Sequence, residues 1–138
     1  MLELVCMQEY AVRLTKGTDL KKEISKICLE NNFDTAVVLS AVGCVDKIKI
    51  RLAKAINYLE VEEDFEIVSL IGTISRGKCH LHISLADEIG NVIGGHLSDG
   101  TIINTTCELV LGILDDYTSS REFDNLTGYD EIVLRKKD

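Results

Sequence analysis

The chain has 138 residues, of which 46% are hydrophobic and 28% charged, a balance that fits one folded domain and excludes a disordered chain. With 23 acidic and 15 basic residues the net charge is -8, which opposes nucleic-acid binding through a broad basic surface. The longest apolar stretches, near residues 36–42 and 109–114, are far shorter than the roughly 18 to 20 residues of a membrane-spanning helix. We therefore expect that this chain is not a membrane protein.

The start of the chain, Met1–Tyr10, carries acidic residues and no basic stretch, which predicts that there is no signal peptide and that the protein is cytoplasmic. The five cysteines are odd in number, widely spaced and without a C-x-x-C pair, so we expect reduced, mostly packed thiols. No proline, linker or repeat interrupts the chain, and residues 1–138 are therefore predicted to form a single domain.

The first half of the chain predicts one helix between strands. A short strand over residues 10–14 leads into a turn and N-cap at residues 17–19, and apolar residues then recur at helical spacing until two asparagines at 31–32. Residues 36–42 are typical of a buried strand, and Gly43 is expected to break it before the next strand at 45–52. A second helix near residues 51–58 is the alternative if the sheet is covered within one chain.

The second half of the chain is rich in predicted strands with short turns between them, including one turn at Arg76-Gly77. The expected strands lie at residues 65–74, 79–86, 92–97, 102–104, 108–114 and 131–134. One clear helix against many consecutive strands predicts an α+β fold with a largely antiparallel sheet and one or two helices.

Residues 72–78 fit G-x-x-x-x-G-K, the start of a phosphate-binding loop, but their context argues against a nucleotide site. Cys79 stands where the loop needs Ser or Thr to hold magnesium. The residues that follow alternate as a strand where a helix N-terminus should bind the phosphates. We therefore expect a turn between strands here.

All three histidines of the chain lie within 17 residues. His80 and His82 are two positions apart on a predicted strand, so their side chains leave the same face. If Ala86 pairs with Val92 in an antiparallel hairpin, His82 lies directly opposite His96, and cross-strand partners have Cβ atoms about 4.5 to 5.5 Å apart. Three imidazoles would then converge on one patch. A slip of the hairpin by one residue would send His96 to the other face.

The functional interpretation of this cluster is a zinc site with three histidine ligands and an open fourth position, because neutral imidazole suits zinc. The structural alternative is three polar side chains on a half-buried sheet face. Nearby carboxylates would orient an imidazole or act as a base on zinc-bound water, although turns on a solvated surface explain some of them equally well. These candidates are Asp87, Glu88, Asp99 and Glu108.

A series of short segments follows a known family pattern in order and spacing. The segments are Gly17–Leu20, Ser40–Gly43, Phe65–Thr73, His80–Asp87, Gly90 with Val92–Leu97, and Gly100 with Thr106–Leu109. In these segments the chain resembles the plants-and-prokaryotes conserved (PPC) domain, and the resemblance covers about residues 10–134. This domain also accompanies AT-hooks in plant nuclear proteins. The resemblance implies an α+β homotrimer that binds metal through the histidines of its H-x-H and G-G-H motifs.

Members of the PPC family are often labelled DNA-binding, a contact attributed in plants to a separate Arg-Gly-Arg-Pro hook. This chain has no such segment, and residues 76–79 are the nearest approach, so we do not expect direct DNA contact. We therefore interpret the protein as a trimeric binding or regulatory module with one zinc site per chain. A metal-dependent enzyme, either a hydrolase or lyase or a cupin-like protein, is the alternative, and the sequence names no substrate.

Overall fold

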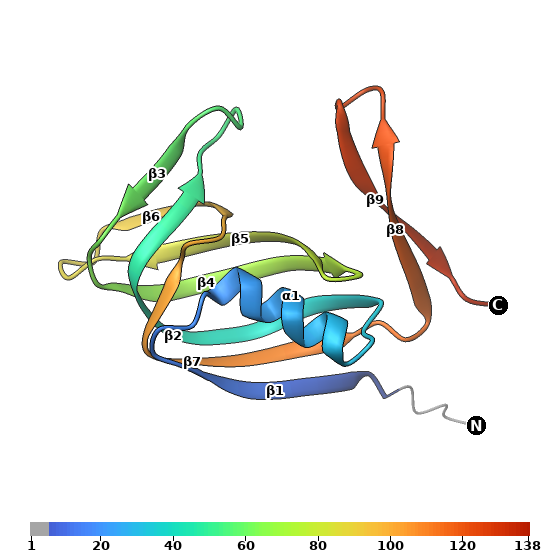
Figure 1. Cartoon of the computed structure of the whole chain (residues 1–138), viewed down its shortest axis with the longest axis horizontal. Coiled ribbons are helices and arrows are strands. Elements are labelled where there is room, and N and C mark those ends of the chain that lie inside the picture. Colours follow the sequence, from blue (N-terminus) through green and yellow to red (C-terminus); the bar gives the residue numbers. More distant parts are fainter. Residues whose placement is uncertain (1–5) are drawn as a thin grey trace.

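The computed structural model describes residues 6–138. The first five residues, on which the expected absence of a signal peptide partly rests, lie outside this range. One helix and nine strands follow one another along the described chain (Figure 1). Their bounds are β1 Gln8–Thr15, α1 Leu20–Glu30, β2 Thr35–Arg51, β3 Tyr58–Val61, β4 Phe65–Ser75, β5 Lys78–Ala86, β6 Val92–Leu97, β7 Ile102–Ile113, β8 Tyr117–Asp124 and β9 Tyr129–Lys136.

Seven strands form one sheet in the order β1-β7-β2-β4-β5-β6, with β3 paired to β2. Every strand pair is antiparallel, which confirms the predicted α+β fold with a largely antiparallel sheet. The last residues of β2 also pair with β6, so that Ile50 opposes Leu97 and Arg51 opposes His96. Because β6 is hydrogen-bonded to both β5 and β2, the strands β2, β4, β5 and β6 form a closed circle of paired strands.

The prediction that Gly43 ends a strand is wrong, because β2 is one strand of 17 residues with a register irregularity at this position. A side chain at Gly43 would overlap the carbonyl oxygen of Thr106 in β7, so glycine allows the two strands to approach each other here. An irregularity of this kind bends a strand without ending it. For the same reason the two strands expected at 102–104 and 108–114 are one strand, β7.

Helix α1 covers one face of the sheet (Figure 1), and it is capped at both ends as its sequence predicts. The Asp19 carboxylate accepts hydrogen bonds from the backbone N of Lys22 at 3.1 Å and of Gly100 at 2.8 Å. Asn31 caps the C-terminus, and Asn32 follows with φ 55°. The helix buries four residues against the core, Leu20, Ile24, Ile27 and Cys28.

The second helix offered as an alternative does not form within residues 6–138. Lys54 and Ala55 have φ values of 73° and 56°, outside the range of a right-handed helix, and this segment turns β2 back into the short β3. Helix α1 has 11 residues. No helix in the described part of the chain is long and apolar enough to cross a bilayer.

Strands β8 and β9 pair only with each other and stand away from the main sheet (Figure 1). Strand β8 was not predicted from the sequence. The hairpin is attached through buried Ser119, whose backbone N donates to Asp34 Oδ1 at 2.8 Å and whose hydroxyl bonds that of Ser75 at 2.7 Å. The attached hairpin stands at the end of the sheet where β4 turns into β5 (Figure 1).

Candidate metal centre

The β5–β6 hairpin has the register predicted from the sequence. Ala86 opposes Val92 and His82 opposes His96. The turn is closed by a hydrogen bond from the backbone N of Asp87 to the carbonyl oxygen of Asn91 at 2.9 Å. The slip that would have sent His96 to the other face does not occur.

The same register continues across four neighbouring strands. Ile71 of β4 opposes His82, His82 opposes His96, and His96 opposes Arg51 of β2. Directly opposed residues project from the same face of a sheet. Arg51 is therefore a close cross-strand neighbour of His96, which the sequence analysis did not predict because the β2–β6 pairing joins distant parts of the chain.

The three imidazoles converge as expected. One ring nitrogen of each of His80, His82 and His96 lies within 4.8 Å of the others, and their ring centroids are 5.2 to 5.6 Å apart. Two nitrogens that each lie about 2.0 to 2.1 Å from one ion are at most about 4 Å apart, so small rotations would let the three rings share an ion.

Hydrogen bonding and protonation at the cluster also fit a metal. His96 Nδ1 is buried and has no hydrogen-bond partner within the described chain, although buried polar atoms are normally paired. Burial, and then the Arg51 guanidinium, lower the pKa of His96 to about 4. The pKa of His80 is lowered by burial, followed by His82 and Arg121. Both imidazoles are therefore neutral at pH 7, the form that binds a metal.

The backbone at Gly72 brings β4 close to the first of these histidines. Gly72 has φ 142°, and a Cβ atom here would overlap the carbonyl oxygen of His80 and lie 2.9 Å from Leu81 Cα. The predicted turn at Arg76-Gly77 joins β4 to β5, with φ values of 48° and 78° suited to a tight hairpin. The G-x-x-x-x-G-K segment thus belongs to two paired strands and shapes the histidine cluster.

The carboxylates named from the sequence lie elsewhere. Asp87 and Glu88 are in the β5–β6 turn, where Asp87 Oδ1 accepts hydrogen bonds from two backbone N–H groups. Glu108 lies in β7, opposite Arg13 of β1, and Asp99 follows the end of β6. Within residues 6–138, none of these four carboxylates lines the cavity beside His80 and His96 or the neighbouring cavity that also contains His82.

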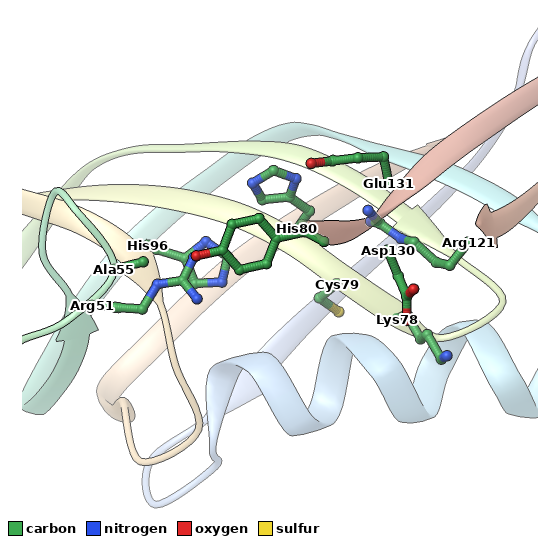
Figure 2. Close-up of a pocket in the computed structure, with 10 residues that line it drawn as sticks. Arg51, Ala55, Lys78, Cys79, His80, His96, Arg121, Asp130 and Glu131 are labelled. Atoms are coloured by element: carbon green, nitrogen blue, oxygen red, sulfur yellow. The ribbon is translucent and has the colours of Figure 1, made fainter. Parts of the chain in front are cut away.

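A cavity of about 400 Å³ opens beside His80 and His96 (Figure 2). Its charged lining residues come from β2, β5 and the β8–β9 hairpin, and they are Arg51, Lys78, Arg121, Asp130 and Glu131. These residues were not predicted from the sequence, because β8 was not expected and only the folded chain brings the hairpin to the histidines.

The cysteines are not part of the proposed ligand set. The Cys79 thiol points to α1, 3.9 Å from the carbonyl oxygen of Lys21, and burial raises its pKa to about 12. Burial also raises the pKa values of Cys28 and Cys107 to about 11. These three thiols are therefore protonated at neutral pH. All five cysteines are free of disulfide bonds, and Cys6 is exposed.

The family of the chain follows from its sequence. The Plants and Prokaryotes Conserved (PCC) domain matches residues 1–115. The chain belongs to this family. The match ends before β8, so the hairpin that completes the cavity lies beyond the matched residues.

Among curated proteins, the chain is 37% identical over 130 residues to the bifunctional protein GlmU of a Synechococcus strain. The match covers 94% of this chain and 21% of that protein, so the chain spans about a fifth of the length of the curated relatives it matches. A second Synechococcus GlmU is 38% identical, with 91% of this chain and 20% of that protein covered.

Solved structures share the fold over nearly the whole chain. A protein of Salmonella enterica superposes with a TM-score of 0.92 at 29% identity, with 99% of both chains covered. A protein of Archaeoglobus fulgidus, described as metal-containing, has a TM-score of 0.76 at 28% identity, with 96% of this chain and 99% of that chain covered.

Proposed function

We propose that this PCC-family chain is a cytoplasmic, single-domain binding or regulatory module that forms a homotrimer and holds one zinc ion per chain. The observation that carries the metal site is the convergence of three imidazoles, together with the unpartnered Nδ1 of His96. The metal-containing Archaeoglobus protein, which shares the fold, supports it. The ligands would be His80, His82 and His96.

Three imidazole ligands suit zinc and would leave one coordination position open, which bound zinc would offer to water or to an acidic ligand. The protein's own part is to fix the imidazoles. His80 and His82 are held by the β4–β5 pairing, and His96 is held between β5 and β2. His80 and His96 also line the cavity of Figure 2, so a ligand in that cavity would lie beside the bound zinc.

Zinc titration of the purified, untagged protein tests the metal site. His82→Ala should abolish most zinc binding and leave the fold intact, because His82 is exposed and its loss leaves the apolar core unchanged. Ser84→Ala, two positions along the same strand, should keep zinc and serves as the matched control. Near-stoichiometric zinc in the His82→Ala protein would refute the site.

The trimer is supported by an apolar surface on β2 and β4. Its large side chains are at least half exposed, and they are Leu39, Val42, Val68 and Ile71. Apolar surface of this kind is typical of an interface between chains, and Ile71 directly opposes His82, so this surface adjoins the metal site.

Light scattering tests the assembly, and should give about three times 15.3 kDa, the mass of a closed ring of three chains. Val68→Lys should shift the protein to the monomer mass. Ile89→Lys, at a position of the β5–β6 turn that is 77% exposed, should leave the trimer intact. A wild-type protein that stays monomeric at micromolar concentration would refute the trimer.

A metal-dependent hydrolase or lyase is the second candidate function, and the cavity beside the histidines is the observation in its favour. Glu131 lines this cavity together with His80, so its carboxylate would be the candidate base. Turnover by the zinc-loaded protein that Glu131→Gln abolishes, with zinc still bound, would favour the enzyme over the binding module.

A further inference from the structure

We propose that the cavity beside the histidines binds a small organic anion, whose carboxylate or phosphate head group is held by Arg51 and Arg121 against the open position of the metal. This inference rests on the proposed zinc site and names the class of ligand that the site takes.

The charge of the cavity is opposite to that of the protein. The whole chain carries a net charge of -8. Three basic and two acidic side chains line the cavity, so a bound dication leaves it with a surplus of three positive charges. Histidine binds a metal as a neutral ligand, so the three imidazoles offset none of this surplus. An anion in the cavity would offset it.

Arg51 and Arg121 are free to bind such an anion. Neither takes part in the ion pairs or side-chain hydrogen bonds found within residues 6–138, whereas Arg76 pairs with Asp34 and Arg135 pairs with Glu122. Figure 2 shows their guanidinium groups reaching into the cavity from opposite sides, Arg51 from the end of β2 and Arg121 from β8. A guanidinium group is planar and binds a carboxylate or a phosphate through two parallel hydrogen bonds.

The position of Arg51 makes an anion and the metal favour each other. Arg51 is the direct cross-strand neighbour of His96 and, after burial, has the largest effect in lowering the pKa of that imidazole. A guanidinium beside a metal-ligating histidine repels the bound dication. An anion between the two removes this repulsion, so anion binding should tighten metal binding, and by reciprocity the metal should tighten anion binding.

The dimensions of the cavity select a small molecule. Its volume of about 400 Å³ is in the range of about 300 to 1,000 Å³ that is usual for small-molecule sites. Asp130 and Glu131, from the start of β9, add negative charge to its lining, which disfavours an extended polyanion such as duplex DNA. Tyr129 adds a ring and a hydroxyl group next to them.

The test uses the full-length protein loaded with Co²⁺, a coloured substitute for zinc whose visible absorption changes when its coordination changes. Inorganic phosphate and succinate are titrated separately into this protein, and either should shift the spectrum in a saturable way. A response to one probe alone identifies the head group, phosphate or carboxylate. The paired substitution Arg51→Gln with Arg121→Gln should weaken this binding at least about tenfold, since each charged hydrogen bond is worth roughly that factor.

Arg13→Gln is the matched control, because Arg13 lies in β1, at the edge of the sheet away from β5 and β6. It should leave anion binding unchanged. If Co²⁺ binds but neither anion shifts the spectrum at about 10 mM, or if the paired variant binds as tightly as the wild type, this inference fails and the metal site stands. If Co²⁺ does not bind at all, the proposed function fails with it.

Discussion

Replacing Gly72 by alanine should damage the histidine cluster although all three histidines are kept. The added Cβ would overlap the His80 carbonyl oxygen and lie 2.9 Å from Leu81 Cα, and both atoms belong to backbone that cannot rotate away. Crowding of this kind costs about 1 to 3 kcal/mol. The backbone conformation, with φ 142°, costs alanine about another 1 to 3 kcal/mol. Gly72→Ala should therefore lose about 2 to 6 kcal/mol of unfolding free energy.

Gly90→Ala separates crowding from backbone strain. Gly90 lies in the β5–β6 turn with φ 85°, and a Cβ atom there would meet nothing within 4 Å. It should lose only about 1 to 2 kcal/mol, the usual cost of a left-handed conformation. Urea unfolding of the metal-free proteins measures both changes, and zinc titration should show weaker binding in Gly72→Ala alone. Equal stability and equal zinc affinity of the two variants would refute the role given to the close approach of β4 and β5.

Three further predictions concern charge and capping. Duplex DNA should bind weakly and without sequence preference, because of the net charge of -8; sub-micromolar, steeply salt-dependent binding in a fluorescence-anisotropy titration would contradict this. The metal-free protein should lose stability as the pH falls from 6.5 to about 4, because burial and Arg51 lower the pKa of His96 and only the unfolded chain takes up that proton in this window. Urea unfolding should show a weaker pH dependence in His96→Gln, and an unchanged one would refute the assignment. Asp19→Ala should lower the unfolding free energy by about 1 to 2 kcal/mol through loss of the helix cap, and a loss no larger than that of Glu23→Ala would count against the cap.

The part of the site that could be predicted from sequence is the part with local causes. Two residues apart on one strand, His80 and His82 share a face whatever the rest of the fold does. The short turn after Ala86 fixes its pairing with Val92, and the register then carries His82 to His96. The predicted convergence of three imidazoles is confirmed because each step depends on neighbouring residues.

Arg51 could not be found in this way, because its approach to His96 needs β2 to pass Gly43 without ending and to reach β6. The sequence shows a glycine after an apolar run, which is equally typical of the end of a strand and of a close approach between strands. Only the neighbouring backbone of β7, at Thr106, decides between these outcomes.

The β8 strand was missed for a different reason. Its sequence, Tyr117–Asp124, is largely polar and lacks the alternation of a strand that covers a core. It forms by pairing with β9 and is attached through the hydrogen bonds of Ser119 to Asp34 and Ser75. Arg121 and the acidic residues of the cavity therefore reach the histidines through contacts that no local pattern encodes.

X-ray absorption spectroscopy of the zinc-loaded protein tests the central claim most directly, because it counts the atoms bound to the metal. With His80, His82 and His96 as ligands, the spectrum should show three imidazole nitrogens at about 2.0 to 2.1 Å and a fourth light atom, with no sulfur. His82→Ala should remove one imidazole, if any zinc remains bound. A first shell that contains sulfur at about 2.3 Å, or fewer than two imidazoles in the wild-type protein, would contradict the account.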